Sequence, residues 1–155
     1  MNAKNVGEKI MEQSMTNRMP VRAHPYDHQQ RAYEFACRQF GLTGCDPPSS
    51  RGVALLMEMG TGKTLTTIAV AGKLYLSRKI TKMLIVAPLS ILGVWQEEFQ
   101  KYANFPYSLA VLNGTGSRKS ENLRQIPTNG LQVAVINYES AWRLEDDLAA
   151  WGADL

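Results

Sequence analysis

The segment Arg51–Thr64 constrains the fold more than any other part of this 155-residue chain. Residues Val53–Met57 are all apolar, which is typical of a strand covered on both faces. Gly60 and Gly62 follow, and glycine lets a backbone turn with positive φ and approach a ligand closely. A helix is expected to begin directly after the second glycine. The segment therefore predicts a buried strand, a tight turn and a helix start.

This turn has the chemistry of a phosphate site. Backbone N–H groups in such a turn form an anion nest, and the start of the helix adds partial positive charge. A lysine there can reach the β- and γ-phosphates of a nucleotide, and a threonine hydroxyl can bind Mg²⁺. Met57 stands where the strict pattern has glycine, and a glycine-rich turn before an ordinary helix is the alternative. The predicted ligand-binding residues are Met59, Gly60, Thr61, Gly62, Lys63 and Thr64.

Composition indicates one globular domain that lies outside the membrane. Apolar residues make up 45% of the chain, enough for a core. The net charge is +3, divided into +7 for residues 1–124 and −4 for residues 125–155, which is compatible with a nucleic-acid partner. Without a membrane-length apolar run or a signal-peptide pattern, the chain is expected to be intracellular: cytoplasmic in a bacterium or virus, nuclear in a eukaryote.

The cysteines and histidines do not form a metal-binding pattern. Cys37 and Cys45 are too far apart for a Cys-x-x-Cys pair, and His24 and His28 lack zinc-finger spacing. We expect two reduced thiols and no metal cluster.

The remaining chain alternates strands and helices. Apolar runs predict strands at residues 83–87, 107–112 and 131–136, and residues 1–20 are expected to be a flexible tail before a domain at 21–155. A helix is expected at 28–40 with an apolar face, and others after each strand. The order predicts a parallel α/β sheet with helices on both faces. The residues expected on the apolar face of helix 28–40 are Ala32, Phe35, Ala36 and Phe40.

Three polar residues are candidates for ligand contacts. Gln29 lies in the first turn of the helix at 28–40, and its amide can match the N6 and N7 edge of adenine, although a lone helical Gln is commonly just solvated. Ser90 and Asn137 follow predicted strands. Ligands of parallel sheets bind at the carboxyl ends of strands, so Gly60–Thr64, Pro88–Ser90 and Asn137–Glu139 are expected at one edge.

These blocks together resemble the first RecA-like domain of the SWI/SNF-type family of superfamily 2 helicase-like ATPases. The family often carries a short Gly-x-Gly-Lys-Thr loop, and its next motif combines Pro-Leu-Ser with Trp-x-x-Glu-Phe. The resemblance covers about residues 22–155. The matching blocks are Pro25–Phe35, Glu58–Thr64, Leu84–Leu92 with Trp95, Glu98 and Phe99, and Val135–Glu139.

The resemblance implies a P-loop NTPase fold that uses ATP and Mg²⁺ to drive movement along double-stranded DNA. By position, Gln29 would read adenine, and the loop residues would hold the phosphates and Mg²⁺, with Lys63 and Thr64 taking part in catalysis. Ser90 and Asn137 would contact the DNA backbone. The family often has Thr where Asn137 stands.

The resemblance also implies a missing part. Hydrolysis needs one carboxylate on Mg²⁺ and another to orient water, which the family supplies in an Asp-Glu-x-His motif. Asp146 and Asp147 lie on a polar helix face instead, and Asp154 lies where that strand should begin. We therefore expect an N-terminal fragment truncated before the catalytic strand, whose partner is the rest of the motor. By itself it should bind nucleotide weakly and hydrolyse almost none.

Two other interpretations remain open. The chain could be a naturally short, non-catalytic nucleotide- or DNA-binding module that acts as a regulatory subunit. RNA helicases and helicase-type restriction subunits share the nucleotide loop, but the block from Pro88 to Phe99 argues against both.

Overall fold

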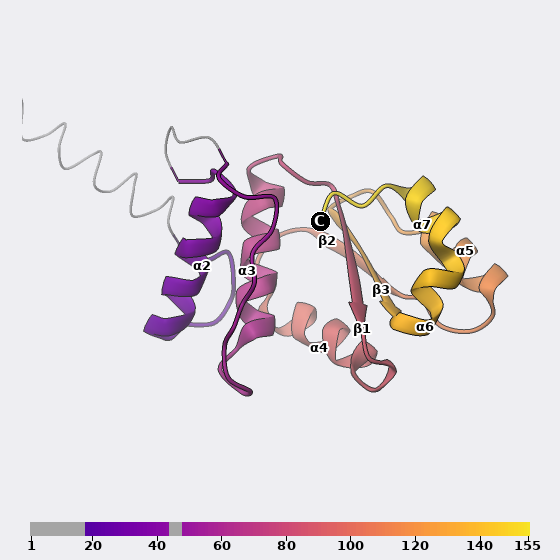
Figure 1. Ribbon diagram of the computed structural model, residues 1–155, viewed down its shortest axis with the longest axis horizontal. Helices are drawn as coiled ribbons and strands as arrows, with labels where there is room; N and C mark the ends of the chain where they lie inside the picture. Colours follow the sequence, from indigo (N-terminus) through magenta and orange to yellow (C-terminus); the bar gives the residue numbers. More distant parts are fainter. Residues whose placement is uncertain (1–17, 44–47) are drawn as a thin grey trace, which may run out of the picture.

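Three parallel strands form the sheet at the centre of the molecule (Figure 1). The structure, a computed structural model, describes residues 18–43 and 48–155. The strands are β1 (Lys82–Ala87), β2 (Tyr107–Val111) and β3 (Leu131–Asn137), and β3 pairs with both others. All of β3 is buried. The parallel α/β sheet expected from the sequence is confirmed.

Helices cover both faces of this sheet, as Figure 1 shows. Alternate residues of β3 serve the two faces: Val133 and Val135 pack into a larger core, and Ala134 and Ile136 into a smaller one. No helix in the described part of the chain has the length and apolar character needed to cross a bilayer. The larger core is covered by α2 (Asp27–Gln39), α3 (Lys63–Leu76) and α4 (Leu92–Tyr102), the smaller by α5 (Gly116–Arg124), α6 (Tyr138–Ala141) and α7 (Glu145–Trp151).

The strand predicted at Val53–Met57 is not formed. These residues are extended but pair with no strand in the described structure, and they alternate between partial and full exposure. Val53 and Leu55 line an apolar pocket with side chains of α2 and α3. The nearest free sheet edge, on β1, is instead contacted by the end of the chain, where Leu84 N donates to Leu155 O at 2.8 Å. An apolar run becomes a strand only where a neighbouring edge can accept its hydrogen bonds.

The buried face of α2 is also rotated from the predicted one. The buried residues are Gln29, Tyr33, Ala36 and Cys37, whereas Phe35 is 46% exposed. Tyr33 can be fully buried because its hydroxyl donates to Arg18 O, a contact between residues 15 apart. The prediction missed this partner because it lies outside the helix.

Residues just before the expected domain start at residue 21 also pack into the core. Met19 is buried, and Val21 forms an antiparallel bridge with Ala103. Residues 1–17, most of the expected tail, lie outside the described residues.

Two helices near the chain end differ in length from expectation. The helix expected after β2 is short and spans Gly116–Arg124, and the Thr115 side chain caps it by accepting from Arg118 N. The helix expected after β3 is divided into α6, a 3-10 turn at Trp142–Leu144 and α7.

Candidate nucleotide site

The turn before α3 has the backbone that the two glycines predicted. Gly60 has φ of 77° and Gly62 of 88°, values that residues with a Cβ rarely adopt. The Thr61 hydroxyl closes the turn by donating to Glu58 O at 2.7 Å. Figure 1 shows this turn on the same, lower side of the molecule as the arrowhead of β1. The turn therefore lies at the carboxyl edge of the sheet.

Lys63 is the first residue of α3 and folds back over this turn. Its Nζ donates to Met57 O and Glu58 O, both at 2.9 Å. These are two neutral carbonyl acceptors, and a charged phosphate oxygen would be a stronger partner for the ammonium. The turn thus surrounds the Lys63 ammonium, and an anionic ligand can replace its two carbonyl partners.

Thr64 differs from the threonines that follow it in α3. Thr66 and Thr67 donate to Gly62 O and Lys63 O, four residues back, so their hydroxyls are used within the helix. Thr64 is partly exposed and makes no such bond in the described structure. Among these three threonines, Thr64 is therefore the one whose hydroxyl is not used within the helix.

Gln29 joins α2 to the turn. It is only 7% exposed, its Oε1 accepts from Tyr26 N, and its Nε2 donates to Thr61 O, both at 3.0 Å. The amide packs so closely that a Cβ on Gly62 would lie 2.2 Å from Nε2. The predicted adenine-reading residue and the predicted phosphate turn are therefore in direct contact.

His28 contacts the same turn, a position that the sequence did not predict. Its Nε2 lies 2.9 Å from Thr61 O, the same oxygen that Gln29 contacts, and its ring stacks on Tyr26 at a centroid distance of 5.8 Å. Its position beside Gln29 in the first turn of α2 was the only signal available.

Ser90 and Asn137 emerge at the same edge of the sheet. Ala87 pairs with Asn137 in the register of β1 and β3, and Ser90 follows in an exposed 3-10 turn at Leu89–Ile91. Asn137 is only 8% exposed, and its Nδ2 donates to Glu139 Oε2 at 2.6 Å. The backbone N–H of Glu139 and this amide lower the pKa of the Glu139 carboxyl. Ser90 is thus free to meet a ligand, whereas the Asn137 amide is already engaged.

The acidic residues considered for hydrolysis lie away from the turn. Asp147 accepts from Ser120 and Arg124 between α5 and α7. Asp154 accepts from Thr81 N and Lys82 N at the amino end of β1. Within residues 18–43 and 48–155 no three His, Cys, Asp or Glu side chains gather as metal ligands. Cys37 is a buried free thiol, and Cys45 lies outside the described residues.

A model of the SNF2-related domain family matches residues 9–152 of this chain. The chain belongs to the SNF2-related domain family. The mouse chromodomain-helicase-DNA-binding protein 1-like is 30% identical over 144 residues, covering 78% of this chain and 15% of that protein. The nuclear protein STH1/NPS1 of Saccharomyces cerevisiae is 32% identical over 83 residues, covering 53% of this chain and 6% of that protein. The chain therefore spans a small part of each relative.

Solved structures agree with the SNF2 assignment. The Sulfolobus solfataricus SWI2/SNF2 ATPase core in complex with double-stranded DNA matches with a TM-score of 0.62 and 27% identity, over 80% of this chain and 23% of that one. The Type ISP restriction-modification enzyme LlaGI matches with a TM-score of 0.57 at 18% identity, over 83% of this chain and 14% of that one. The second match supports the fold only. The fold is that of a SNF2 ATPase core, a RecA-like P-loop domain.

Proposed function

We propose that this chain is the ATP-binding part of the first RecA-like lobe of a SNF2-type translocase on double-stranded DNA. The observation that carries the proposal is the contact between Gln29 and the turn that surrounds the Lys63 ammonium. Residues 21–155 would form this part of the lobe. The remaining half of the motor would be its partner.

The turn fits the phosphates of ATP. Gly60 and Gly62 hold the turn in a left-handed backbone conformation, and the Lys63 ammonium can exchange its carbonyl partners for phosphate oxygens. The charge of the phosphates would be offset by Mg²⁺ held through the Thr64 hydroxyl. Thr64 would supply its hydroxyl to the metal. The backbone of Met59, Gly60, Thr61 and Gly62 would line the phosphate site.

Gln29 can read adenine without releasing the turn. A glutamine amide has two acceptor lone pairs and two N–H donors. Its two contacts, with Tyr26 N and Thr61 O, use one of each. One acceptor and one donor remain, which is the pair that the N6 and N7 edge of adenine requires.

DNA would bind across the carboxyl edge of the sheet. The archaeal SWI2/SNF2 ATPase core is described in complex with double-stranded DNA, which supports duplex DNA as the partner. Ser90 would contact the sugar–phosphate backbone, and Asn137 would do so if its amide exchanged Glu139 for the DNA. Backbone contacts position a protein without reading sequence, as a translocase requires. One relative is named a nuclear protein, and a nuclear location is expected if this chain is eukaryotic.

The experiment is a titration of the purified chain with a fluorescent ATP analogue and Mg²⁺. Lys63→Ala should weaken binding at least tenfold, since it removes the cation. Lys79→Ala, an exposed lysine in the turn between α3 and β1, should leave binding unchanged. Absence of nucleotide binding by the wild-type chain would overturn the proposal.

Hydrolysis is expected to need carboxylates from the rest of the motor, because Asp147 and Asp154 are engaged elsewhere. Phosphate release by the purified chain, with and without duplex DNA, should stay at the buffer level. Lys63-dependent, DNA-stimulated turnover would contradict this division of the site.

A further inference from the structure

A lysine of α5 reaches the carboxyl end of the central strand. Lys119 lies in the first turns of α5, and its Nζ donates to Ser140 Oγ of α6 at 2.5 Å. Ser140 is three residues beyond Asn137, the last residue of β3. The contact joins residues 21 apart and places a cation beside the proposed DNA edge.

The present partner of Lys119 is neutral. Ser140 offers a hydroxyl, and no carboxylate of the described residues forms an ion pair with Lys119. The nearest acid in sequence to this strand end, Glu139, accepts from Asn137 instead. An N–H⁺ bond to a phosphate oxygen is shorter and about twice as strong as one to a neutral acceptor. A phosphate arriving at this edge can therefore displace Ser140.

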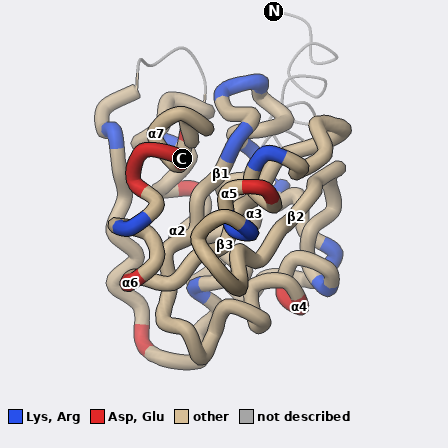
Figure 2. The backbone as a smooth tube through the Cα atoms, turned by 90° about the vertical axis from the view of Figure 1, so that its right-hand side faces the viewer, with Lys and Arg blue, Asp and Glu red and all other residues tan. Residues whose placement is uncertain are grey.

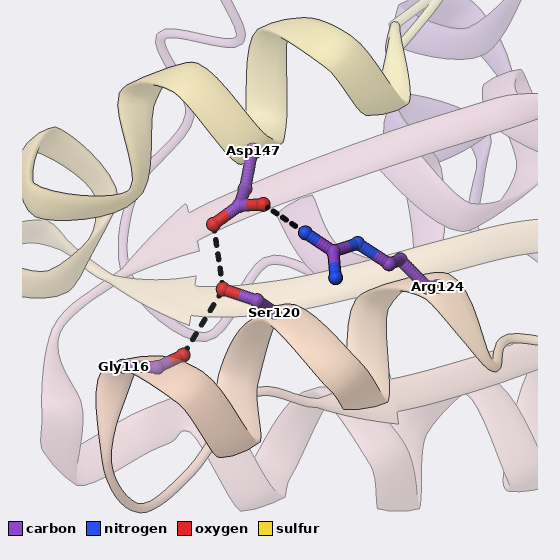
Figure 3. A network of polar contacts seen from close by, with 4 residues as sticks. All are labelled: Gly116, Ser120, Arg124 and Asp147. Atoms are coloured by element: carbon purple, nitrogen blue, oxygen red, sulfur yellow. Dashed lines mark hydrogen bonds and ion pairs between the residues drawn. The ribbon is translucent and has the colours of Figure 1, made fainter.

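Asp147 of α7 contacts Ser120 and Arg124 of α5, and we call this network beside Lys119 the clamp. Asp147 of α7 accepts from Ser120 Oγ at 2.6 Å and from Arg124 Nη2 at 2.8 Å (Figure 3). The Ser120 hydroxyl and then the Arg124 guanidinium lower the pKa of the Asp147 carboxyl, so it stays ionised. The clamp fixes α5 against α7 from the position next to Lys119.

Because Asp147 pairs with Arg124, the basic residues of α5 are not equivalent. Figure 2 looks onto this side of the molecule, where α5 carries both basic and acidic segments. Arg124 forms an ion pair with Asp147, while Arg118 and Lys119 lie toward the other end of the helix, from which Lys119 contacts Ser140 just beyond β3. This face therefore carries charges of both signs and is not a continuous basic surface. Binding of a phosphate there would depend on individual cations at the strand edge.

We propose that Lys119 is a further contact to the DNA phosphate backbone and that Asp147 is the positioning residue that holds it there. The inference rests on the proposed DNA binding of the chain. The Asn137 amide at the end of β3 is neutral and already donates to Glu139. Lys119 would supply a cation for the DNA at this position.

The test measures the affinity of the full chain for a labelled DNA duplex at several salt concentrations. Each phosphate contact contributes about −0.9 to the slope of log K against log salt. Lys119→Ala should reduce the slope by about one and weaken binding several-fold on any sequence. Lys79→Ala removes the same charge near the amino end of β1 and should leave the slope unchanged.

The outcomes separate this inference from the function on which it rests. A wild-type chain that does not bind DNA overturns the proposed function itself. Wild-type binding with equal slopes for Lys119→Ala and Lys79→Ala overturns the Lys119 contact alone. ATP-analogue binding should be the same in all three proteins.

Asp147→Asn tests the positioning role. Removing a negative charge should by itself strengthen DNA binding, so weaker binding with a reduced salt slope would show that the clamp places Lys119. Adding Asp147→Asn to Lys119→Ala should then have no further effect on the slope. A lower melting temperature with an unchanged slope would mean that Asp147 is only structural and would overturn its positioning role.

Discussion

At the residue scale, Gly62 meets two demands at once. Its φ of 88° favours glycine, and the Gln29 amide occupies the space where a Cβ would stand. Gly62→Ala should therefore displace Gln29 and strain the turn, lowering nucleotide affinity at least tenfold and stability by about 1–3 kcal/mol. Nucleotide titration and urea unfolding of the variant measure the two effects.

Two other glycines are matched controls for this prediction. Gly60 also has positive φ, but nothing lies within 4 Å of the position that a Cβ would take, so Gly60→Ala should cost only the backbone strain. Gly93, inside α4, has neither constraint, and Gly93→Ala should stabilise by roughly 0.5–1 kcal/mol. Equal losses of nucleotide affinity in the Gly60 and Gly62 variants would show that the Gln29 contact is unimportant.

The sequence predicted which residues form the candidate site better than how they contact one another. The roles of Gln29 and Lys63 came from motif chemistry, which depends on residue type and spacing. The shared contact of Gln29 and His28 with Thr61 O joins segments more than 30 residues apart. Such a contact depends on how α2 docks on α3, and no local pattern encodes it.

At the element scale, Asp154 secures the amino end of β1. Its Oδ2 accepts from Thr81 N at 2.7 Å and from Thr81 Oγ1 and Lys82 N, both at 3.0 Å. The Thr81 backbone bond is the largest cause that lowers the pKa of this carboxyl in the folded chain. The stabilisation is therefore present above the unfolded value of about 3.9 and is lost as the pH falls through the lower, folded pKa.

Asp154→Asn should remove this pH-dependent stabilisation. The variant should unfold at lower urea than the wild type at pH 7, and the two midpoints should converge as the pH falls below the unfolded value of about 3.9 and the wild-type carboxyl protonates. Urea titrations from pH 7 to pH 2.5 measure the difference. Glu97→Gln, an exposed change in α4, is the control; a gap for Asp154→Asn that stays constant with pH would contradict the explanation.

Some elements are predicted by the local sequence pattern alone, whereas others form only if a second segment is available to pair with them. β1, β2 and β3 fall within one residue of their predicted bounds, because strands joined by helices in a parallel sheet are marked by near-continuous apolar runs. Val53–Met57 has the same pattern but pairs with no strand in the described part of the chain, and the β1 edge is contacted near Leu84 by Leu155. Strand pairing is a property of two segments, and the pattern describes one.

At the scale of the whole molecule, the sheet has an incompletely covered side. The end of the chain contacts β1 only around Lys82 and Leu84, and no strand in the described part pairs with the rest of that edge. Beside it lies an apolar pocket lined by Phe40, Val53, Leu55 and Met83, among others. Unpaired edges and exposed apolar patches favour pairing between molecules.

The purified 155-residue chain is therefore expected to self-associate at micromolar concentration. Leu56 and Met59, 96% and 94% exposed on the segment beside the pocket, would add apolar contact area between copies. Sedimentation velocity over a concentration series should show mass rising with concentration, and Leu56→Ser should reduce the rise without lowering the melting temperature. Leu76→Ser, at the far end of α3 and 54% exposed, should not reduce it. A monodisperse monomer that melts cooperatively at high temperature would mean that this side of the sheet is already satisfied, and the extended Val53–Met57 segment would then be a stable feature of the fold rather than a strand without a partner.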